Sequence, residues 1–362
     1  MQYHLNRSKI TFTKVIQITL SIFFITVPTF AKTKSIHQEK FVRIGGIEQW
    51  ITIHGADSTK PVILFLHGGP GSVMSAYDNT IYGEWEKDFV LVSWDQRGAG
   101  RTFGKNVPKQ HDEEYWINNP LTVDQMAADG IELSEYLIKE LHQPKIILIG
   151  TSWGSVLGAT MALKRPDLFY AYIGHSQVVN GTETLVHAYH TVYKLAQKAN
   201  DNESINKLTT LGVPPYDDAK NTGQLFRVIK KYERENSVPA PNTWWKLAPA
   251  YDNETDARNR EDGDDYSFIN YVGHKKLGIK AMSATVDFMK NGLTFQLPVY
   301  IIQGEADILT PQELTKPYFD KLHAVHKEYF LVPGAAHGHN QSVIDTQYKV
   351  AKAGIASLQK KK

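Results

Sequence analysis

The sequence contains no cysteine among its 362 residues. This absence excludes disulfide bonds, thiolate catalysis, cysteine-ligated metal sites and a lipid anchor carried by a cysteine. A chain without disulfides relies on its hydrophobic core for stability. A chain of this length is able to bury such a core.

Several other patterns are missing as well. We find no internal repeat, no low-complexity run, no phosphate-binding glycine loop and no basic patch with interleaved aromatic residues, so a nucleic-acid partner is not expected. The hydrophobic content of 42% and the charged content of 22% are ordinary for a globular protein. The length fits one large α/β domain with an insertion, or two domains.

The first 31 residues contain no Asp or Glu. Basic residues Arg7, Lys9 and Lys14 precede the uncharged run Val15 to Ala31, which ends with small residues at 29 and 31. This pattern predicts a signal peptide over 1–31 and an exported protein, periplasmic or extracellular. The alternative is an uncleaved membrane anchor, for which the run is short. Cleavage would leave no stable membrane contact, and the net charge of residues 32–362 would be −1.

The most informative stretch is the apolar run 145–149 followed by Gly150-Thr-Ser152-Trp-Gly154. This G-x-S-x-G pattern is typical of a nucleophile elbow, in which a strand turns sharply into a helix and exposes a serine hydroxyl. Glycines flank the serine because a Cβ at either place would collide with the neighbouring strand or helix. The sequence therefore predicts Ser152 as a nucleophile.

Short apolar runs alternate with helical patterns along much of the chain. We expect a hairpin of strands 41–44 and 47–53 turning at Gly45-Gly46, and a helix over about 122–141 that begins with a capping box. A final helix is expected at about 343–358. Further strands are expected at 61–66, 89–94, 145–149, 171–174, 298–303 and 328–332. This alternation predicts an α/β fold with a mostly parallel sheet and helices on both faces.

A serine nucleophile needs a base and an acid that holds the base. Asp307 follows one predicted strand by a few residues, and His337 follows the next. We predict the triad Ser152, Asp307 and His337. His339 is the competing base, and Glu305 is a spare carboxylate.

An oxyanion hole needs two backbone N–H groups. We assign them to Trp153, directly after the nucleophile, and to Gly69 in the loop His67-Gly-Gly-Pro-Gly71. Asp95 and Arg97 in a nearby loop are expected to form a buried pair that braces the site.

Between about 180 and 292 the apolar strand runs disappear, while charge and Asn content rise. We expect a mainly helical cap inserted there, between core segments 32–179 and 293–362. Neither His187-x-x-His190 nor His323-x-x-His326 has a third ligand near it in sequence, so no metal site and no cofactor are expected.

Together these motifs resemble the prolyl iminopeptidase branch of the α/β-hydrolases. The matching pieces are His67-Gly-Gly-Pro-Gly71, Trp94-Asp-Gln-Arg-Gly-Ala-Gly100, Gly150-Thr-Ser-Trp-Gly-Ser155, Gly304 to Asp307 and Gly334-Ala-Ala-His337. The resemblance implies an α/β-hydrolase fold, an acyl-enzyme on Ser152 and the removal of N-terminal residues, especially proline, from short peptides.

The family binds the free amine of its substrate with acidic cap residues, beside a Trp-x-x-Trp-Glu element. Here Trp244-Trp245 is followed by Lys246, and the candidate carboxylates include Glu183, Glu233 and Glu235. The sequence does not choose among them, so the substrate-binding residues stay open. The alternatives are an esterase or lactonase on the same core, acting on a small ester, and a non-catalytic binding protein of this fold. The sequence leaves the oligomeric state undetermined.

Overall fold

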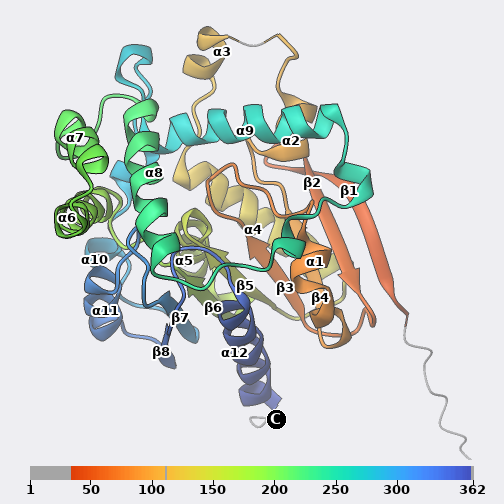
Figure 1. Cartoon of the computed structure of the whole chain (residues 1–362). Coiled ribbons are helices and arrows are strands. Elements are labelled where there is room, and N and C mark those ends of the chain that lie inside the picture. Colours follow the sequence, from red (N-terminus) through yellow and green to blue (C-terminus); the bar gives the residue numbers. More distant parts are fainter. Residues whose placement is uncertain (1–33, 111, 360–362) are drawn as a thin grey trace, which may run out of the picture. The chain divides into compact units, whose positions relative to one another are not determined.

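A single eight-stranded sheet organises the part of the chain that the computed structural model describes, residues 34–110 and 112–359 (Figure 1). The predicted signal peptide lies outside the described residues. The strand order is β1-β2-β4-β3-β5-β6-β7-β8. The strands are β1 (Ile36–Ile44), β2 (Ile47–Gly55), β3 (Val62–Leu66), β4 (Val90–Trp94), β5 (Ile146–Thr151), β6 (Phe169–His175), β7 (Val299–Gly304) and β8 (Lys327–Val332).

The sheet is parallel from β4 to β8, and β1 and β2 join it antiparallel at one edge. β1 and β2 form the predicted hairpin, with Gly45 at φ 55° and Gly46 at φ 79° in its turn. Two consecutive positive φ values suit a tight two-residue turn, and glycine adopts them without steric cost. The predicted mostly parallel sheet is confirmed.

Helices cover both faces of this sheet (Figure 1). The helices of the core are α1 (Asp78–Tyr82), α2 (Gly100–Asn106), α3 (Glu113–Asn118), α4 (Val123–Glu140), α5 (Trp153–Lys164), α11 (Gln312–Lys321) and α12 (Gln341–Gln359), with the 3-10 turns η1 (Gly83–Lys87) and η2 (Pro166–Leu168). As predicted, Thr122 caps α4 by accepting a hydrogen bond from the backbone N–H of Gln125.

Two apolar layers hold the helices to the sheet. Leu64 and Leu148 point to the face covered by α4, α5 and α11, whereas Ile63 and Ile147 point to the face covered by α1, η1 and α12. This alternation along each strand is what a sheet buried on both faces requires. Each fully buried aliphatic side chain contributes about 1.5–3 kcal/mol of transfer free energy.

A helical segment is inserted between β6 and β7, as predicted. It contains α6 (Gly181–Ala199), α7 (Asn202–Leu211), α8 (Ala219–Glu235), α9 (Glu254–Val272) and α10 (Phe288–Asn291), with η3 (Asn242–Trp245), η4 (Pro249–Tyr251), η5 (Lys275–Leu277) and η6 (Met282–Thr285). α6, α7 and α8 share a small apolar cluster that also receives Ile308 from the core. The exact bounds of a cap domain, 180–292, stay a prediction.

α9 lies across loops of the core, and its Tyr266, Tyr271 and Val272 join the apolar cluster there. Its Gly263-Asp264 stretch packs closely on Gly71. A Cβ added to Gly71 would lie 2.3 Å from the Cα of Asp264. Ser267 donates a hydrogen bond to the carbonyl of Gly98. A helix of very polar sequence is thus held by close backbone packing, by hydrogen bonds and by a few buried apolar side chains. Among the described helices, none combines the length and the apolar character needed to cross a membrane.

Candidate active site

Ser152 sits in a sharp turn between β5 and α5, at φ 54° and ψ −118°. A non-glycine residue at positive φ is strained and persists only where its surroundings impose the conformation. Here the backbone N–H of Ser152 donates to the carbonyl of His175 on the next strand, at 3.0 Å. The turn directs the serine into a cavity at the carboxyl ends of the parallel strands.

The two glycines of the elbow have the steric role expected from the sequence. A Cβ on Gly154 would lie 1.9 Å from the carbonyl oxygen of Leu66, and one on Gly150 would lie 2.3 Å from the carbonyl oxygen of Gly154. Contacts this short with backbone atoms are impossible without moving a strand. The elbow therefore depends on both glycines.

His337 reaches Ser152 from the loop after β8. Its Nε2 lies 2.8 Å from Ser152 Oγ, and its Nδ1 lies 3.1 and 3.2 Å from the two carboxylate oxygens of Asp307. The structure thus brings the three predicted triad residues into one hydrogen-bonded chain, in the order nucleophile, imidazole and carboxylate. Their catalytic roles stay a prediction at this point.

Asp307 is fully buried by its surroundings and held by neighbouring donors. The backbone N–H and the hydroxyl of Thr310 each donate to one of its oxygens at 2.7 Å. The loop that carries Asp307 and the loop that carries His337 are joined by the hydrogen bond from the N–H of Ala306 to the carbonyl of Ala335, at 2.8 Å. The carboxylate is thereby fixed before any ligand arrives.

A second carboxylate stands behind this pair. Glu233 of α8 is buried, and its Oε1 accepts hydrogen bonds from the backbone N–H groups of Ile308 and Leu309, at 2.9 and 3.2 Å. Burial raises the pKa of Glu233 to about 7, although the charge of His337 opposes the shift. The helical insert therefore holds the segment that follows Asp307.

The charges around His337 determine its basicity. Burial alone would lower the pKa of His337, but the charge and hydrogen bond of Asp307, with the charge of Glu233, outweigh burial and hold that pKa above its ordinary value. A histidine of raised pKa is a stronger base once it is neutral. It needs a higher pH to become neutral.

His339, the competing base, occupies a different place. Its Nε2 lies 3.2 Å from the hydroxyl of Tyr82 and 3.3 Å from that of Thr151, and its ring centroid lies 5.0 Å from that of His175. Burial lowers the pKa of His339 to about 4, so the ring is neutral near pH 7. Only His337 of the two histidines contacts Ser152 in the described structure.

The loop predicted to form part of the oxyanion hole closes over Ser152. A Cβ on Gly68 would lie 3.4 Å from Ser152 Cβ, and Gly69 has φ 108°, which favours glycine. Gly68 and Gly69 both line the cavity. Trp153 is the first residue of α5, where the backbone N–H has no partner within the helix. The assignment of the oxyanion donors to Trp153 and Gly69 stays a prediction.

Gln96 ties this loop to the elbow, a role that sequence reasoning missed. Its side chain accepts from the indole N–H of Trp153 at 2.9 Å and donates to the carbonyl of His67 at 3.1 Å. Its backbone N–H donates to Nε2 of His67, whose Nδ1 lies 2.9 Å from the carbonyl of Gly68. Burial lowers the pKa of His67 to about 4. The neutral ring thus links the two loops.

The expected pair of Asp95 with Arg97 was wrong. Asp95 is buried and accepts from the hydroxyl of Ser75 and from the backbone N–H of Arg101. Arg97 instead pairs with Asp129 of α4 at 2.7 Å. Asp95 faces the start of α2, whereas Arg97 reaches α4.

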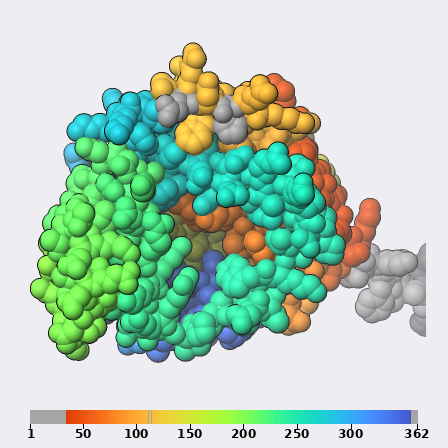
Figure 2. Space-filling model, turned by 45° about the horizontal axis from the view of Figure 1, so that its top comes forward, coloured from red at the N-terminus to blue at the C-terminus, as the bar shows by residue number. Residues whose placement is uncertain are grey.

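The cavity above Ser152 has a volume of about 420 Å³. Figure 2 shows it as a hollow bordered by the green and teal insert, with orange and blue parts of the core at its floor. Its lining is largely apolar and includes Phe65, Met74, Phe226, Phe268 and Leu309. Such a cavity is of the size that binds a small molecule.

Three charged side chains from the insert line the same cavity: Asp264 of α9, and Arg227 and Lys230 of α8. Asp264 accepts a hydrogen bond from Ser72 at 3.1 Å. The carboxylate remains accessible through the cavity mouth, yet the protein around it displaces much of its water and raises its pKa. Of the carboxylates considered from the sequence, Glu183 borders a separate hollow and Glu235 is exposed.

The sequence pattern of the family described as "Serine aminopeptidase, S33" matches residues 57–340, which include Ser152, Asp307 and His337. The chain belongs to the serine aminopeptidase S33 family. It is a serine hydrolase of that family, with the α/β-hydrolase fold.

Similar proteins in other organisms agree with this family. The chain is 29% identical over 311 residues to "Probable aminopeptidase YbaC" of Bacillus subtilis, covering 84% of this chain and 92% of that protein. It is 27% identical over 213 residues to a proline iminopeptidase of Saccharolobus solfataricus, covering 56% of this chain and 60% of that protein.

Among solved structures, the fold is similar to that of the proline iminopeptidase of Mycobacterium smegmatis. The TM-score is 0.61 at 15% identity, over 89% of this chain and all of that chain. VinJ is similar at a TM-score of 0.58 and 18% identity, over 89% of this chain and 99% of that one. At these identities the likeness is one of fold.

Proposed function

We propose that this S33 family member is an aminopeptidase that releases N-terminal residues, proline among them, from short peptides through an acyl-enzyme on Ser152. The observation that carries the proposal is the hydrogen-bonded chain from Ser152 through His337 to Asp307, which opens into a cavity lined by a carboxylate of the insert.

In the proposed reaction, Nε2 of His337 takes the proton of Ser152 Oγ as that oxygen attacks the carbonyl carbon of the first peptide bond. The N–H groups of Trp153 and Gly69 bind the resulting oxyanion. His337 then gives the proton to the leaving amine, and the carbon–nitrogen bond breaks. The first residue remains as an ester on Ser152.

Water completes the cycle. His337 removes a proton from a water molecule that attacks the ester carbonyl, and then returns that proton to Ser152 as the free amino acid leaves. Asp307 accepts the Nδ1 hydrogen bond of His337, so it holds the ring with Nε2 toward the serine and stabilises the imidazolium that forms twice per cycle.

We assign the substrate's free amine to Asp264. Its position in the cavity, the hydrogen bond from Ser72 and its place on α9 support this assignment. An ammonium group beside a partly desolvated carboxylate forms a strong charge-assisted hydrogen bond. Phe226 and Phe268 line the cavity and would contact a small apolar first residue such as proline.

The second candidate is an esterase or lactonase on the same residues. Arg227 and Lys230 outnumber Asp264 in the cavity, and the remaining lining is largely apolar. A substrate with an acidic or neutral group in place of the free amine would suit that balance. A non-catalytic role finds no comparable support.

The deciding experiment compares three substrates: a prolyl arylamide, the same arylamide with a blocked amine, and a simple aryl ester. The aminopeptidase proposal expects the free-amine amide to be cleaved at a far higher kcat/KM than the blocked amide. Ester cleavage without amide turnover would overturn it in favour of the esterase. The Ser152→Ala variant, measured on all three, controls for contaminating activity.

Export is a separate part of the proposal and depends on the N-terminal segment 1–31. Expression of the full chain in a bacterial host with fractionation of the cells tests it. We expect a processed protein, shortened by about 31 residues, in the periplasm or the medium. An unprocessed chain in the cytoplasm would overturn export and leave the catalytic proposal unaffected.

A further inference from the structure

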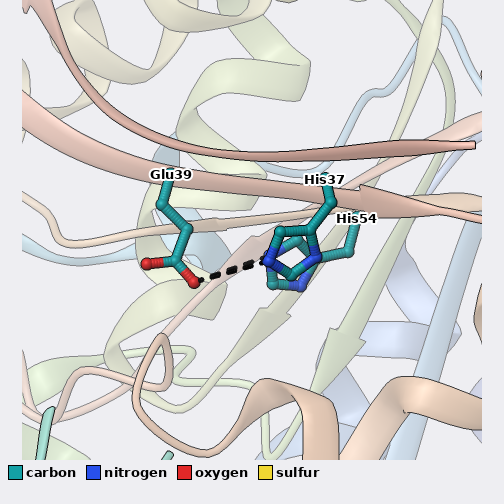
Figure 3. A group of neighbouring side chains, drawn as sticks. All are labelled: His37, Glu39 and His54. Atoms are coloured by element: carbon teal, nitrogen blue, oxygen red, sulfur yellow. Dashed lines mark ion pairs between the residues drawn. The ribbon is translucent and has the colours of Figure 1, made fainter. Parts of the chain in front are cut away.

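Three side chains that can bind metal meet on the antiparallel edge of the sheet, at β1 and β2. His37 of β1 and His54 of β2 are direct cross-strand partners, and Glu39 lies two residues after His37 on the same face of the strand. Figure 3 shows the two rings and the carboxylate pointing toward one another. This cluster lies outside the cavity of Ser152, and the proposed reaction does not use it.

The geometry is that of three ligands arranged around one point. Nε2 of His37 and Nε2 of His54 each lie 3.9 Å from the same oxygen of Glu39, Oε1. The three ligand atoms all lie within 4.8 Å of one another. The separation of 3.9 Å is too long for a hydrogen bond.

The buried member of the group lacks a partner. His54 is 6% exposed, and within the described chain its Nε2 has no hydrogen-bond partner. A buried polar atom without a partner costs roughly 1–3 kcal/mol, and such atoms are uncommon in native proteins. The atom points toward Glu39, where a bound ion would satisfy it.

We propose that His37, Glu39 and His54 bind a divalent transition-metal ion, for which Zn²⁺ is the best match. Two imidazole nitrogens and one carboxylate oxygen form a ligand set that suits Zn²⁺, and water takes the fourth position. With metal–ligand distances of about 2.0–2.2 Å, ligand atoms around a tetrahedral ion lie roughly 3.4 Å apart. The observed 3.9 Å therefore requires a contraction of about half an ångström.

The required adjustment falls on the exposed side chains of the cluster. The two rings are stacked, with centroids 4.1 Å apart and planes 3° from parallel, so both lone pairs cannot point at one ion until a ring turns. The side chain of His37 is 73% exposed and that of Glu39 is 29% exposed, whereas His54 is packed. His37 turns out of the stack, and the buried ring stays in place.

Surrounding charges orient Glu39 for this role. Arg101 Nη1 lies 4.0 Å from the other carboxylate oxygen, Oε2, which leaves Oε1 facing the two rings. The positive charge of Arg101 is itself balanced by Asp256 at 2.8 Å. Glu86 adds negative potential near His54. Partners that fix the orientation of a ligand in this way strengthen metal binding.

The ion would clamp the open end of the first hairpin. His37 and His54 pair one position from the end of the β1–β2 register, opposite the Gly45-Gly46 turn. Because the ion binds only where both strands are paired, it stabilises the folded chain by an amount that grows with its free concentration. The expected function of the site is therefore structural.

The test uses the full chain, stripped with a chelator and titrated with ZnCl₂ by isothermal calorimetry. We expect one saturable site in the unmodified protein. His37→Asn and Glu39→Gln, both at accessible side chains, should weaken it by about tenfold or more, since losing a ligand costs at least as much as losing a residue that only orients a ligand. Zn²⁺ should raise the melting temperature of the unmodified protein and leave that of His37→Asn unchanged.

His326→Asn is the matched control. His326 and Glu328 repeat the His-x-Glu spacing at the start of β8, where they form an exposed pair at 2.7 Å. Zn²⁺ affinity should be unchanged in this variant. Absence of a saturable site, or equal affinity in His37→Asn and His326→Asn, would overturn the proposal and leave the rings as an ordinary cross-strand stack.

Discussion

The carboxyl end of the sheet, with Ser152, and the helical insert are built on different principles. At the carboxyl end of the sheet, Ser152, Asp307 and His337 each follow a parallel strand, and backbone hydrogen bonds between adjacent loops set their separations. In the insert, Glu233 and Asp264 take their positions from helices that pack on core loops.

We expect the residues at the strand ends to carry out the reaction and the residues of the insert to select the substrate. The carboxyl ends of parallel strands lie at the same end of the sheet, so residues just after them come together whichever segments cover them. The helices of the insert are placed by their packing, and a small shift would move Asp264 relative to Ser152 without disturbing the triad. We therefore expect substitutions at the sheet edge to affect all substrates and substitutions in the insert to affect substrates selectively.

Ser152→Ala gives the largest expected effect. Loss of the nucleophile should reduce kcat by roughly 10⁴- to 10⁶-fold on every substrate, since the acyl-enzyme no longer forms. Melting temperature should stay near that of the unmodified protein. Ser342→Ala, at an exposed position of α12, makes the same chemical change away from the site and should leave kcat unaltered. A near-normal rate in Ser152→Ala would refute the proposal that Ser152 is the nucleophile.

Asp264→Asn tests the insert. Removal of the carboxylate should lower kcat/KM for free-amine substrates by roughly 10- to 100-fold, the range expected for a lost hydrogen bond between charged groups. Substrates with a blocked amine should be unaffected, because they lack the ammonium. Asp265→Asn, at the next residue of α9 and outside the cavity, is the control. An equal loss on blocked substrates would contradict the assignment.

Gly154→Ala and Gly223→Ala compare the two regions by stability. A Cβ at Gly154 would lie 1.9 Å from a backbone oxygen, whereas the described structure has no atom within 4 Å of a Cβ at Gly223. We expect Gly154→Ala to lower the free energy of unfolding by about 1–3 kcal/mol. Gly223→Ala in the α8 helix should raise it by up to about 1 kcal/mol. Urea denaturation measures both, and equal changes would refute the steric account.

Glu233→Gln should produce the smallest effect, a shift in the pH profile. Activity needs neutral His337, so it falls as pH drops through the pKa of His337, which Asp307 and Glu233 raise. Removing the charge of Glu233 lowers that pKa and should move the acid limb of kcat to lower pH. Glutamine keeps an oxygen for the N–H of Ile308. Glu235 is exposed on the same helix, so Glu235→Gln should leave the acid limb of the pH profile unchanged.

Much of the sheet edge could be predicted because its signals are local. A strand pattern followed by a glycine-flanked serine, and two later strands followed by Asp307 and His337, all lie in short segments of sequence. The predicted fold class was confirmed for the same reason, since apolar runs alternate with helical patterns. The preference for His337 over His339 rested on its distance from the strand, and the hydrogen bond to Ser152 agrees with it.

Other parts depended on contacts between segments that are far apart in the chain. Arg97 was expected to pair with Asp95, two residues away, but it pairs with Asp129 of α4, which lies 32 residues further along the chain. His54 is separated from His37 by a hairpin, so the His37, Glu39 and His54 cluster appears only once the two strands are in register. The pairs considered from the sequence, His187 with His190 and His323 with His326, are closer in sequence than His37 and His54 but have no third ligand near them in sequence.

The sequence by itself determined the layered sheet and the places of Ser152, Asp307 and His337 just after its strands. Periodic burial and turn chemistry act over a few residues, and such signals can be recognised in one chain. Only the tertiary structure decided which insert carboxylate enters the cavity and which one holds the loop after Asp307. It also decided which histidines meet on the β1–β2 hairpin. Those outcomes follow from the packing of α8 and α9 on core loops and from strand register, which join residues 17 to more than 190 positions apart.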